Sequence, residues 1–403
     1  MKAGNKYLIL IILLGFLLRL LFLLLVTDLN SVNHFEYGAI AENLHHGNGY
    51  ALYNFEDGKF NIGVSKHGIT YKSAFMPPLY TEILYLFFFI KDIAARNFSV
   101  LLFQTLISVI IIYLVYNLTK KLFDRNAALF AALITAILPE FIYAANQSGT
   151  TIIFQTGIIV VFIFTNELNT NRNKITTSII LGITLGLLIL LRSEVLVFAI
   201  ILFIYLLFNK QVRAAMIIAI TALLVVAPWQ IRNIITFREM VPLSTSLGTN
   251  LYRGHNPYAI GVWSDEIIEE KRLKFKNDPN YEVRINEYLV NKALQNIYRN
   301  PVEELKYVLE KIYNLWLFNP NDPRSSNYYY LIPWFILLSL FPLSLIKSFN
   351  WNKQKFIFLF LIYFNVIVIV FFCLPRYQTM MKIALVPFAG EGIRILYDKV
   401  IIR

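Results

Sequence analysis

The sequence has few charged residues and almost no cysteine. Only 15% of its 403 residues are Asp, Glu, Lys or Arg, whereas 57% are hydrophobic. Soluble domains carry about 25% charged residues, so a chain of this composition would aggregate in water, and a soluble or an intrinsically disordered protein is excluded. The single cysteine, Cys373, lies in an apolar run and excludes an intrachain disulfide framework.

The net charge of +12 comes from 37 Lys and Arg against 25 Asp and Glu. Such an excess can indicate a nucleic-acid-binding surface, but no DNA- or RNA-binding motif accompanies it here. In membrane proteins an excess of Lys and Arg marks the cytoplasmic loops. We therefore expect membrane lipids, and no nucleic acid, among the partners of this chain.

Ten stretches are apolar enough to cross a bilayer, which takes about 20 residues of helix. They are residues 7–26, 98–118, 127–145, 150–165, 176–191, 195–208, 214–231, 328–346, 356–374 and 380–396. Residues 79–90 are also apolar but make only about half a span, so we interpret them as re-entrant or interfacial. The pattern predicts an all-α integral membrane protein, a multi-span bundle of about 10–12 helices.

The polar segments divide the chain. We expect an N-terminal transmembrane module at 1–231 with a polar loop at 27–97, a loop and helical subdomain at 232–327, and C-terminal transmembrane helices at 328–403. If 79–90 does not cross, every short basic loop falls on one side of the membrane, which the positive-inside rule makes cytoplasmic. The two long loops then face the extracytoplasmic side of the plasma membrane. These two loops contain all five histidines, so we expect the functional site in them.

A short amphipathic helix is expected in the first loop within residues 33–50. Glu36 lies in its first turn, where a carboxylate is favoured by the helix dipole. A carboxylate at the membrane surface is suited to taking a proton from an acceptor hydroxyl or amine. A solvated glutamate at the start of a helix is the alternative interpretation. His45 and His46 are adjacent and lack the spacing of a metal site.

Several basic residues are expected at the outer half of the membrane, where they would suit a lipid phosphate. They are Arg192, Arg376, Lys382, Lys72 and Lys66. Head-group anchoring, or a structural pair between Arg192 and Glu194, is the alternative for the arginines. Arg19 in the first span is expected to extend toward the outer surface.

The loop at 241–263 is rich in Gly, Asn, Ser, Thr and aromatic residues, a composition that suits a sugar-binding surface. His255, Asn256 and Trp263 are its candidate contacts to a sugar or acceptor. The same composition serves any ordered loop.

Together these stretches resemble the GT-C-fold glycosyltransferases that use polyprenyl-phosphate sugars, in the branch of the protein mannosyltransferases and the aminoarabinose transferases of lipid A. The resemblance extends over nearly the whole chain, in the right order. It is carried by residues 36–37 (EY), 41–44 (AENL), 47–50 (GNGY), 77–80 (PPLY), 186–194 (GLLILLRSE), 228–233 (PWQIRN), 254–263 and 375–377 (PRY).

The resemblance implies an inverting membrane transferase with its active face outside. A sugar moves from a polyprenyl phosphate to a glycolipid, lipid A or protein, with no cofactor. No Asp-x-Asp occurs in either long loop, so a requirement for a divalent metal ion is not indicated. Glu36 would be the base, and Arg376, Arg192, Lys72, Tyr37 and Lys382 would hold the donor phosphate. Relatives commonly carry an aspartate about four residues before the tyrosine; this chain has Asn33 there, with Asp28 in reserve.

Two other functions share the lipid and the arginines. One is a flippase or transporter for a polyprenyl-linked sugar, although such proteins often show internal repeats and none is seen here. The other is an inactive relative that serves as a scaffold, for which Asn33 is the main indication.

Overall fold

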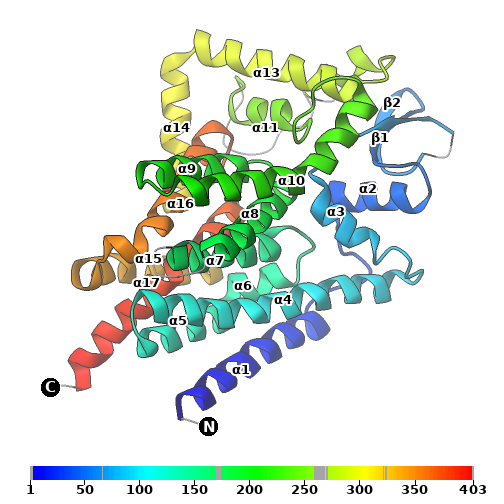
Figure 1. The fold of residues 1–403 in the computed structure, drawn as a ribbon. Helices are drawn as coiled ribbons and strands as arrows, with labels where there is room; N and C mark the ends of the chain where they lie inside the picture. The colour runs from blue at the N-terminus through cyan, green and yellow to red at the C-terminus, as the bar shows by residue number, and fades with distance from the viewer. Residues whose placement is uncertain are drawn as a thin grey trace.

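The computed structural model describes residues 3–65, 67–168, 174–257, 268, 271–320, 322 and 325–401. Its membrane helices form one bundle (Figure 1). They are α1 (Ala3–Leu25), α4 (Ile93–Leu122), α5 (Arg125–Ile137), α6 (Pro139–Ala145), α7 (Thr151–Leu168), α8 (Lys174–Leu191), α9 (Val195–Phe208), α10 (Val212–Phe237), α15 (Tyr328–Ser348), α16 (Trp351–Val370) and α17 (Pro375–Ile401).

The expected spans coincide with these helices, which confirms the multi-span helical fold. Within the described ranges seven helices are long and apolar enough to cross a membrane, and the bent pair α5–α6 makes an eighth. Helix α9 is shorter, with 14 residues, and α17 is long but carries charged residues. The chain is therefore an integral membrane protein.

The core of the bundle is built around α17. Its residues Ile383, Ala384 and Leu385 are completely buried, because α17 packs against α4, α5, α7 and α15. Between α8 and α10 the approach depends on a glycine: a Cβ on Gly182 would lie 2.6 Å from the Cβ of Thr221.

The bend between α5 and α6 is stabilised by Arg19 of α1. The two helices differ in direction by 56°, and Pro139 begins the second one, where it has no N–H to donate to the first. The Arg19 guanidinium donates to the carbonyls of Ala136 at 2.9 Å and Thr135 at 3.0 Å, and to Ser108 Oγ at 2.8 Å. Arg19 is completely buried, so the expectation that it extends outward is wrong: the carbonyls freed by the bend bind it inside.

The first loop, residues 26–92, contains α2 (Phe35–His45), β1 (Ala51–Glu56), β2 (Lys59–Ile62), β3 (Ile69–Lys72) and α3 (Pro78–Tyr85). The strands form an antiparallel sheet in the order β2-β1-β3. Asp57 and Gly58, with φ of 53° and 81°, make the two-residue turn between β1 and β2. The sequence predicted α2 but not this small sheet.

Helix α3 settles how the stretch at 79–90 lies. It has eight residues, which gives about 12 Å of helix, far less than the bilayer core requires. The chain therefore enters and leaves α3 on the same side, as expected.

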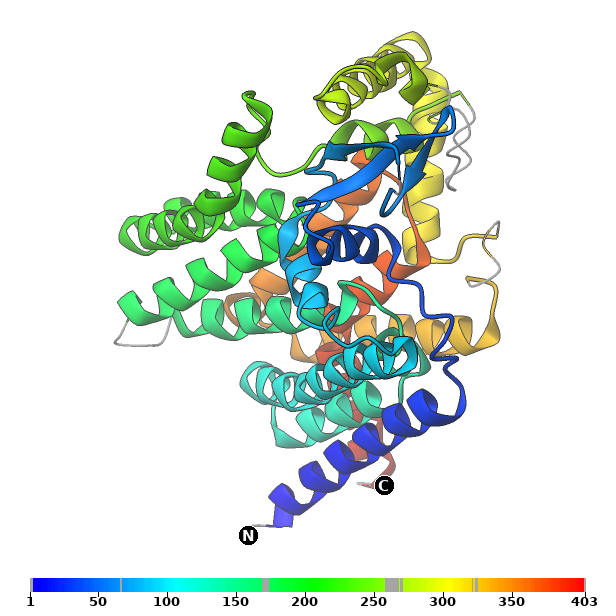
Figure 2. The ribbon, with the colours of Figure 1, turned by 90° about the vertical axis from the view of Figure 1, so that its right-hand side faces the viewer.

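The second loop, residues 238–327, contains α11 (Leu247–Gly254), η1 (Leu273–Phe275), α13 (Tyr281–Arg299) and α14 (Pro301–Trp316). It packs on the first loop: Glu282 Oε2 accepts from Ala74 N at 3.0 Å and from Thr245 Oγ1 at 2.7 Å. Figure 2 shows the sheet between α2 and the helices of the second loop. Both loops thus lie at one end of the bundle, which we call the loop face.

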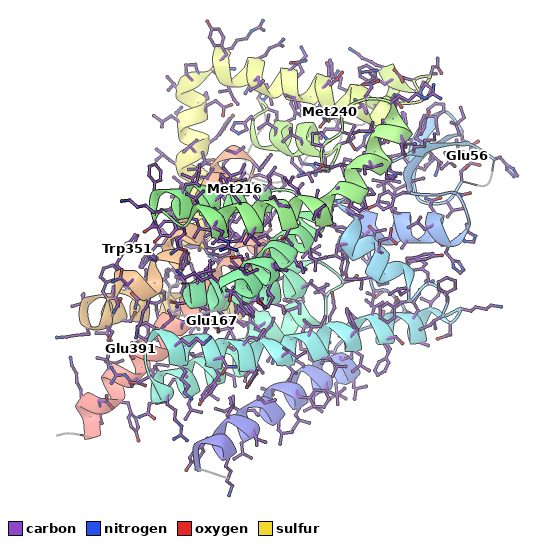
Figure 3. All side chains as sticks on the ribbon, viewed as in Figure 1. Glu56, Glu167, Met216, Met240, Trp351 and Glu391 are labelled. Atoms are coloured by element: carbon purple, nitrogen blue, oxygen red, sulfur yellow. The ribbon has the colours of Figure 1, made fainter. Side chains whose placement is uncertain are left out.

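The opposite end of the bundle holds the short turns with their basic residues. Lys120 and Lys121 end α4, and Lys347 lies in the last turn of α15. Figure 3 shows Glu56 and Met240 near the loop face, with Glu167, Trp351 and Glu391 toward the other end.

Candidate active site

The first turn of α2 presents a carboxylate beside a strained backbone. Phe35 has a φ of 51°, in the left-handed region, which costs a bulky residue about 1–3 kcal/mol. Its N–H donates to Asn33 Oδ1 at 2.7 Å, so the Asn33 side chain caps this turn. Glu36 follows, half-buried, and in the described part of the chain it makes no hydrogen bond or ion pair. Its carboxylate is therefore available to another molecule.

A chain of polar side chains holds α2 in place. His34 Nε2 donates to Asn97 Oδ1 at 2.7 Å, and His34 Nδ1 lies 2.7 Å from Ser148 Oγ. Tyr80 of α3 lies 2.9 Å from Ser148 Oγ and donates to Gln104 Oε1 at 3.0 Å. Burial lowers the pKa of His34, which favours the neutral ring.

The sequence analysis did not identify this network. Asn97 and Gln104 are buried polar residues within a span, and intramembrane polar residues are a recognisable signal of a site. Their partners, however, lie far along the chain and could not be assigned from spacing.

Arg192 follows the last residue of α8 and is already paired. Its Nε donates to Glu194 Oε1 at 2.6 Å, Nη2 forms an ion pair with the same oxygen, and Nη1 donates to Thr150 Oγ1 at 3.2 Å. The guanidinium also lies 5.4 Å from the centre of the Tyr377 ring. The structural pair with Glu194 is thus present, and it neutralises much of the charge of Arg192.

Arg376 lies in the first turn of α17 with an exposed side chain. Its guanidinium is 5.8 Å from the centre of the Tyr377 ring. Over the described ranges it has no carboxylate partner and no hydrogen bond. Arg376 is therefore a cation that a ligand can reach.

Tyr37 joins these groups across the loop face. Its ring packs edge-on against Tyr80, with centroids 5.2 Å apart. Burial raises the pKa of Tyr37 to about 12, although the charges of Arg192 and Arg376 act to lower it. The structure thus brings together α2, the α8–α9 turn and the start of α17, with Glu36 beside Tyr37. We call Glu36, Tyr37, Arg192, Arg376 and Tyr377 the arginine site.

An apolar groove of about 300 Å³ lies between α4, α7 and α8. Its lining includes Ile110, Gly157 and Thr184, and it reaches Leu191, the residue before Arg192. Ile153, also in the lining, follows Thr150 in the same helix turn. The groove is therefore apolar, and its lining includes the residue that precedes Arg192 in the chain.

Two of the expected phosphate contacts lie elsewhere. Lys382 forms an ion pair with Glu140 and is completely buried, with its Nζ 4.8 Å from the centre of the Trp334 ring. Lys72 ends β3 with an exposed side chain, and no contact between described residues joins it to the arginines. Lys66 lies outside the described residues.

The expected sugar contacts also have structural roles or lie outside the described chain. His255 is buried against Glu304 and the end of α16. Asn256 is buried and donates to the carbonyl of Tyr252 at 2.8 Å, which closes α11. Trp263 lies outside the described residues.

A metal site is not assembled by the parts of the chain that the structure describes. No three carboxylate, histidine or cysteine side chains come together there as ligands. That no metal or cofactor is needed remains a prediction.

Part of the chain is similar in sequence to a known protein family. The family model described as dolichyl-phosphate-mannose-protein mannosyltransferase matches residues 76–231, from α3 into α10 and less than half of the chain. No curated protein sequence matches this chain.

Solved structures match over nearly the whole chain. The archaeal oligosaccharyltransferase AglB from Archaeoglobus fulgidus, in complex with an inhibitory peptide and a dolichol-phosphate, matches 99% of this chain with a TM-score of 0.60 and 14% identity. The same enzyme tethered with an acceptor peptide matches 99% with a TM-score of 0.59 and 14% identity. ArnT from Cupriavidus metallidurans bound to undecaprenyl phosphate matches 97% of this chain and 78% of its own, with a TM-score of 0.45 and 12% identity.

The chain spans about half the length of AglB, 51% and 50% in the two structures. At this level of identity the likeness concerns the fold. The expected resemblance is confirmed at that level: the chain has the GT-C membrane fold, shared with the archaeal oligosaccharyltransferase.

Proposed function

We propose that this protein is a membrane glycosyltransferase that moves a sugar from a polyprenyl-phosphate donor to an acceptor on the extracytoplasmic face. The observation that carries the proposal is Arg376: an exposed guanidinium without a carboxylate partner in the described chain, across the loop face from the available carboxylate of Glu36. The acceptor is a glycolipid, lipid A or a protein.

The position of the loop face supports the sidedness. Because α3 does not cross, the basic turns, with Lys120 and Lys121, all lie at the end opposite to the loops. The positive-inside rule makes that end cytoplasmic. The arginine site then faces the outside of the plasma membrane.

The donor is recognised at two places. Its polyprenyl chain lies in the apolar groove that ends at Leu191, and its phosphate is bound by Arg376, with Arg192 and Tyr37 beside it. A guanidinium matches phosphate oxygens in a bidentate manner. AglB and ArnT were solved with dolichol-phosphate and undecaprenyl phosphate, lipids of the class proposed here.

The reaction is a single displacement at the anomeric carbon. The acceptor oxygen or nitrogen forms a bond to that carbon, and Glu36 takes its proton. The bond from the carbon to the phosphate oxygen breaks, and polyprenyl phosphate leaves with the electron pair. Arg376 stabilises the charge that develops on the leaving group. Attack opposite to the leaving group inverts the configuration.

The test is transfer of labelled sugar from synthetic polyprenyl-phosphate donors by the purified protein. We expect Glu36→Gln to lower turnover by at least about 100-fold, the usual effect of losing a general base. Glu42→Gln, an exposed glutamate on the same helix, is the matched control and should be nearly normal. Full activity of Glu36→Gln contradicts the assignment of the base.

A donor that binds without being turned over would favour a flippase or an inactive scaffold instead. Binding to the wild type and to Arg376→Ala therefore belongs in the same experiment. Loss of binding in Arg376→Ala, with transfer by the wild type, supports the enzyme.

A further inference from the structure

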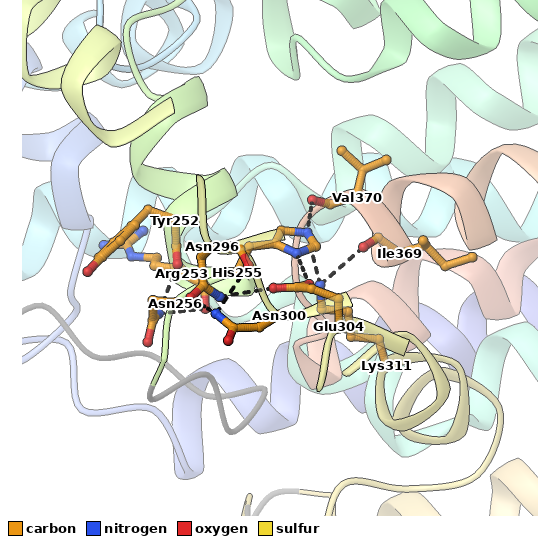
Figure 4. A network of polar contacts seen from close by, with 10 residues as sticks. All are labelled: Tyr252, Arg253, His255, Asn256, Asn296, Asn300, Glu304, Lys311, Ile369 and Val370. Atoms are coloured by element: carbon orange, nitrogen blue, oxygen red, sulfur yellow. Dashed lines mark hydrogen bonds and ion pairs between the residues drawn. The ribbon is translucent and has the colours of Figure 1, made fainter. Parts of the chain in front are cut away.

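The last turn of α16 is held by side chains of the second loop (Figure 4). Lys311 of α14 donates from Nζ to the Ile369 carbonyl at 3.1 Å, and Nε2 of His255 lies 2.9 Å from the Val370 carbonyl. The last carbonyls of a helix have no partner within it, and a cation is favoured there by the helix dipole. The backbone is equally close: a Cβ on Gly254 would lie 1.7 Å from the Phe371 carbonyl oxygen.

The side chains that make this contact form one buried cluster. Glu304 Oε2 lies 2.5 Å from His255 Nδ1, and Lys311 Nζ lies 3.2 Å from His255 Nε2. Asn296 donates to the other oxygen of Glu304 at 3.1 Å. His255, Glu304 and Lys311 are 6%, 6% and 2% exposed. We call these three residues the cap cluster; removing one of them leaves a buried charge without its partner.

Helix α14 also reaches the other side of the α16–α17 turn. Trp316 Nε1 donates to Asn365 Oδ1 of α16 at 2.9 Å. Gln378 of α17 donates to the carbonyls of Leu315 and Leu317, at 3.1 Å in both cases. The end of α14 is therefore hydrogen-bonded both to α16, before the turn at 371–374, and to α17, after this turn.

Along the chain, Arg376 lies between these two sets of contacts, six residues after Val370 and two before Gln378. Since its guanidinium has no hydrogen bond or ion pair within the described residues, its position depends on the backbone of the turn. Nothing else in the arginine site fixes it, apart from the ring of Tyr377.

We propose that the cap cluster and α14 position Arg376 for the donor phosphate, so that the second loop controls donor binding. These are positioning residues, because they touch the turn and not the donor. The proposal rests on the proposed function, in which Arg376 binds that phosphate. A binding group held by such contacts loses affinity when its support shifts by about 1 Å.

The experiment measures KM and kcat for the donor with the full-length protein in nanodiscs. Lys311→Met removes the bond to Ile369 and should raise the donor KM about tenfold, because a displaced Arg376 loses a charge-assisted hydrogen bond to the donor phosphate. The acceptor KM should stay within about twofold. Lys306→Met is the matched control: Lys306 lies on the same helix, exposed, and pairs with Glu303 at 2.8 Å.

A double mutant separates positioning from a general loss of stability. If Lys311 acts through Arg376, Lys311→Met adds little to the donor-binding defect of Arg376→Ala, because coupled residues are not additive. Equal effects of Lys311→Met in both backgrounds, or a normal donor KM in Lys311→Met alone, overturn the proposal. Near-normal donor binding by Arg376→Ala itself would instead overturn the phosphate assignment.

If Lys311→Met does not yield folded protein, Gln378→Leu tests the positioning of Arg376 instead. It removes the bonds from α17 to the end of α14 and leaves the cap cluster intact. A raised donor KM that is absent in the Arg376→Ala background supports positioning, and an unchanged donor KM contradicts it.

Discussion

Lys382 of α17 and Glu140 of α6 form an ion pair with no solvent exposure on either side chain. Thr379, one turn before Lys382, lies 3.4 Å from the other oxygen of Glu140. The pair connects the central helix α17 to the bent pair α5–α6, and so lies within the bundle and not among groups that a donor can reach.

We predict that Lys382→Met alone destabilises the protein by about 3–5 kcal/mol, because it leaves a buried carboxylate unpaired. The double variant Lys382→Met/Glu140→Gln should recover most of that loss. Thermal unfolding in detergent measures both, with Lys121→Met, which breaks the exposed pair with Glu167, as the control. A double variant no better than the single one contradicts the prediction.

The groove should select donors by chain length. Thr184→Trp places a large side chain in the groove of about 300 Å³ and should raise the KM for long-chain donors at least about fivefold, since the chain loses buried area. Donors with two isoprene units should be affected less. Ile183→Trp, on the neighbouring exposed position, is the control and should bind both donors normally. Equal loss for both chain lengths in Thr184→Trp speaks against the groove as the path of the chain.

Asn33 should tolerate a carboxylate. Its oxygen accepts from Phe35 N, and an aspartate oxygen would accept the same bond. We therefore expect Asn33→Asp to fold normally and, in the Glu36→Gln background, to restore part of the transfer activity. Restored turnover above the Glu36→Gln level is the measurement. If the double variant Asn33→Asp/Glu36→Gln is as inactive as Glu36→Gln alone, the catalytic carboxylate is required at position 36.

The stabilisation of α2 by the hydrogen bonds of His34 should decrease in acid. Burial lowers the pKa of His34 below 6.5, the hydrogen bond to Asn97 raises it, and Arg96 lowers it. Because the unfolded state then binds the proton more readily, the contribution of His34 is complete above about pH 6.5 and is lost as the pH falls toward the folded-state pKa. Melting temperatures of wild type, His34→Gln and the exposed control His46→Gln between pH 7.5 and about 5 test this. His34→Gln should lose part of the pH dependence, and an unchanged profile contradicts it.

The sequence was sufficient for the elements that hydropathy determines. The ten apolar stretches matched helices, and the short stretch at 79–90 stays on one side, because length and composition alone decide whether a helix can cross. The strands β1–β3, of four to six residues, carry too little pattern to be recognised.

The candidate site was predictable in part. Arg376 and Glu36 are available as expected, and their roles remain predictions. Lys382 was grouped with Arg376 by its nearness in sequence, but six positions along a helix turn the side chain by about 240° and move it about 9 Å along the axis, into the bundle beside Glu140. The partners of His34, at Asn97 and Ser148, depend on the packing of α2 against α4, which no local pattern contains.

The buried guanidinium of Arg19 has a consequence for biosynthesis. Helix α1 is synthesised before α4 and α5, and three of the groups that bind Arg19, on Ser108, Thr135 and Ala136, follow about a hundred residues later. Until then a cation in mid-membrane costs at least about 2.5–3.5 kcal/mol, and the apolar residues of α1, whose mean hydropathy is 3.1 with Arg19 included, offset it. The polar contacts of α1 are thus completed only after α5 and α6, which follow it in the chain, have packed beside it.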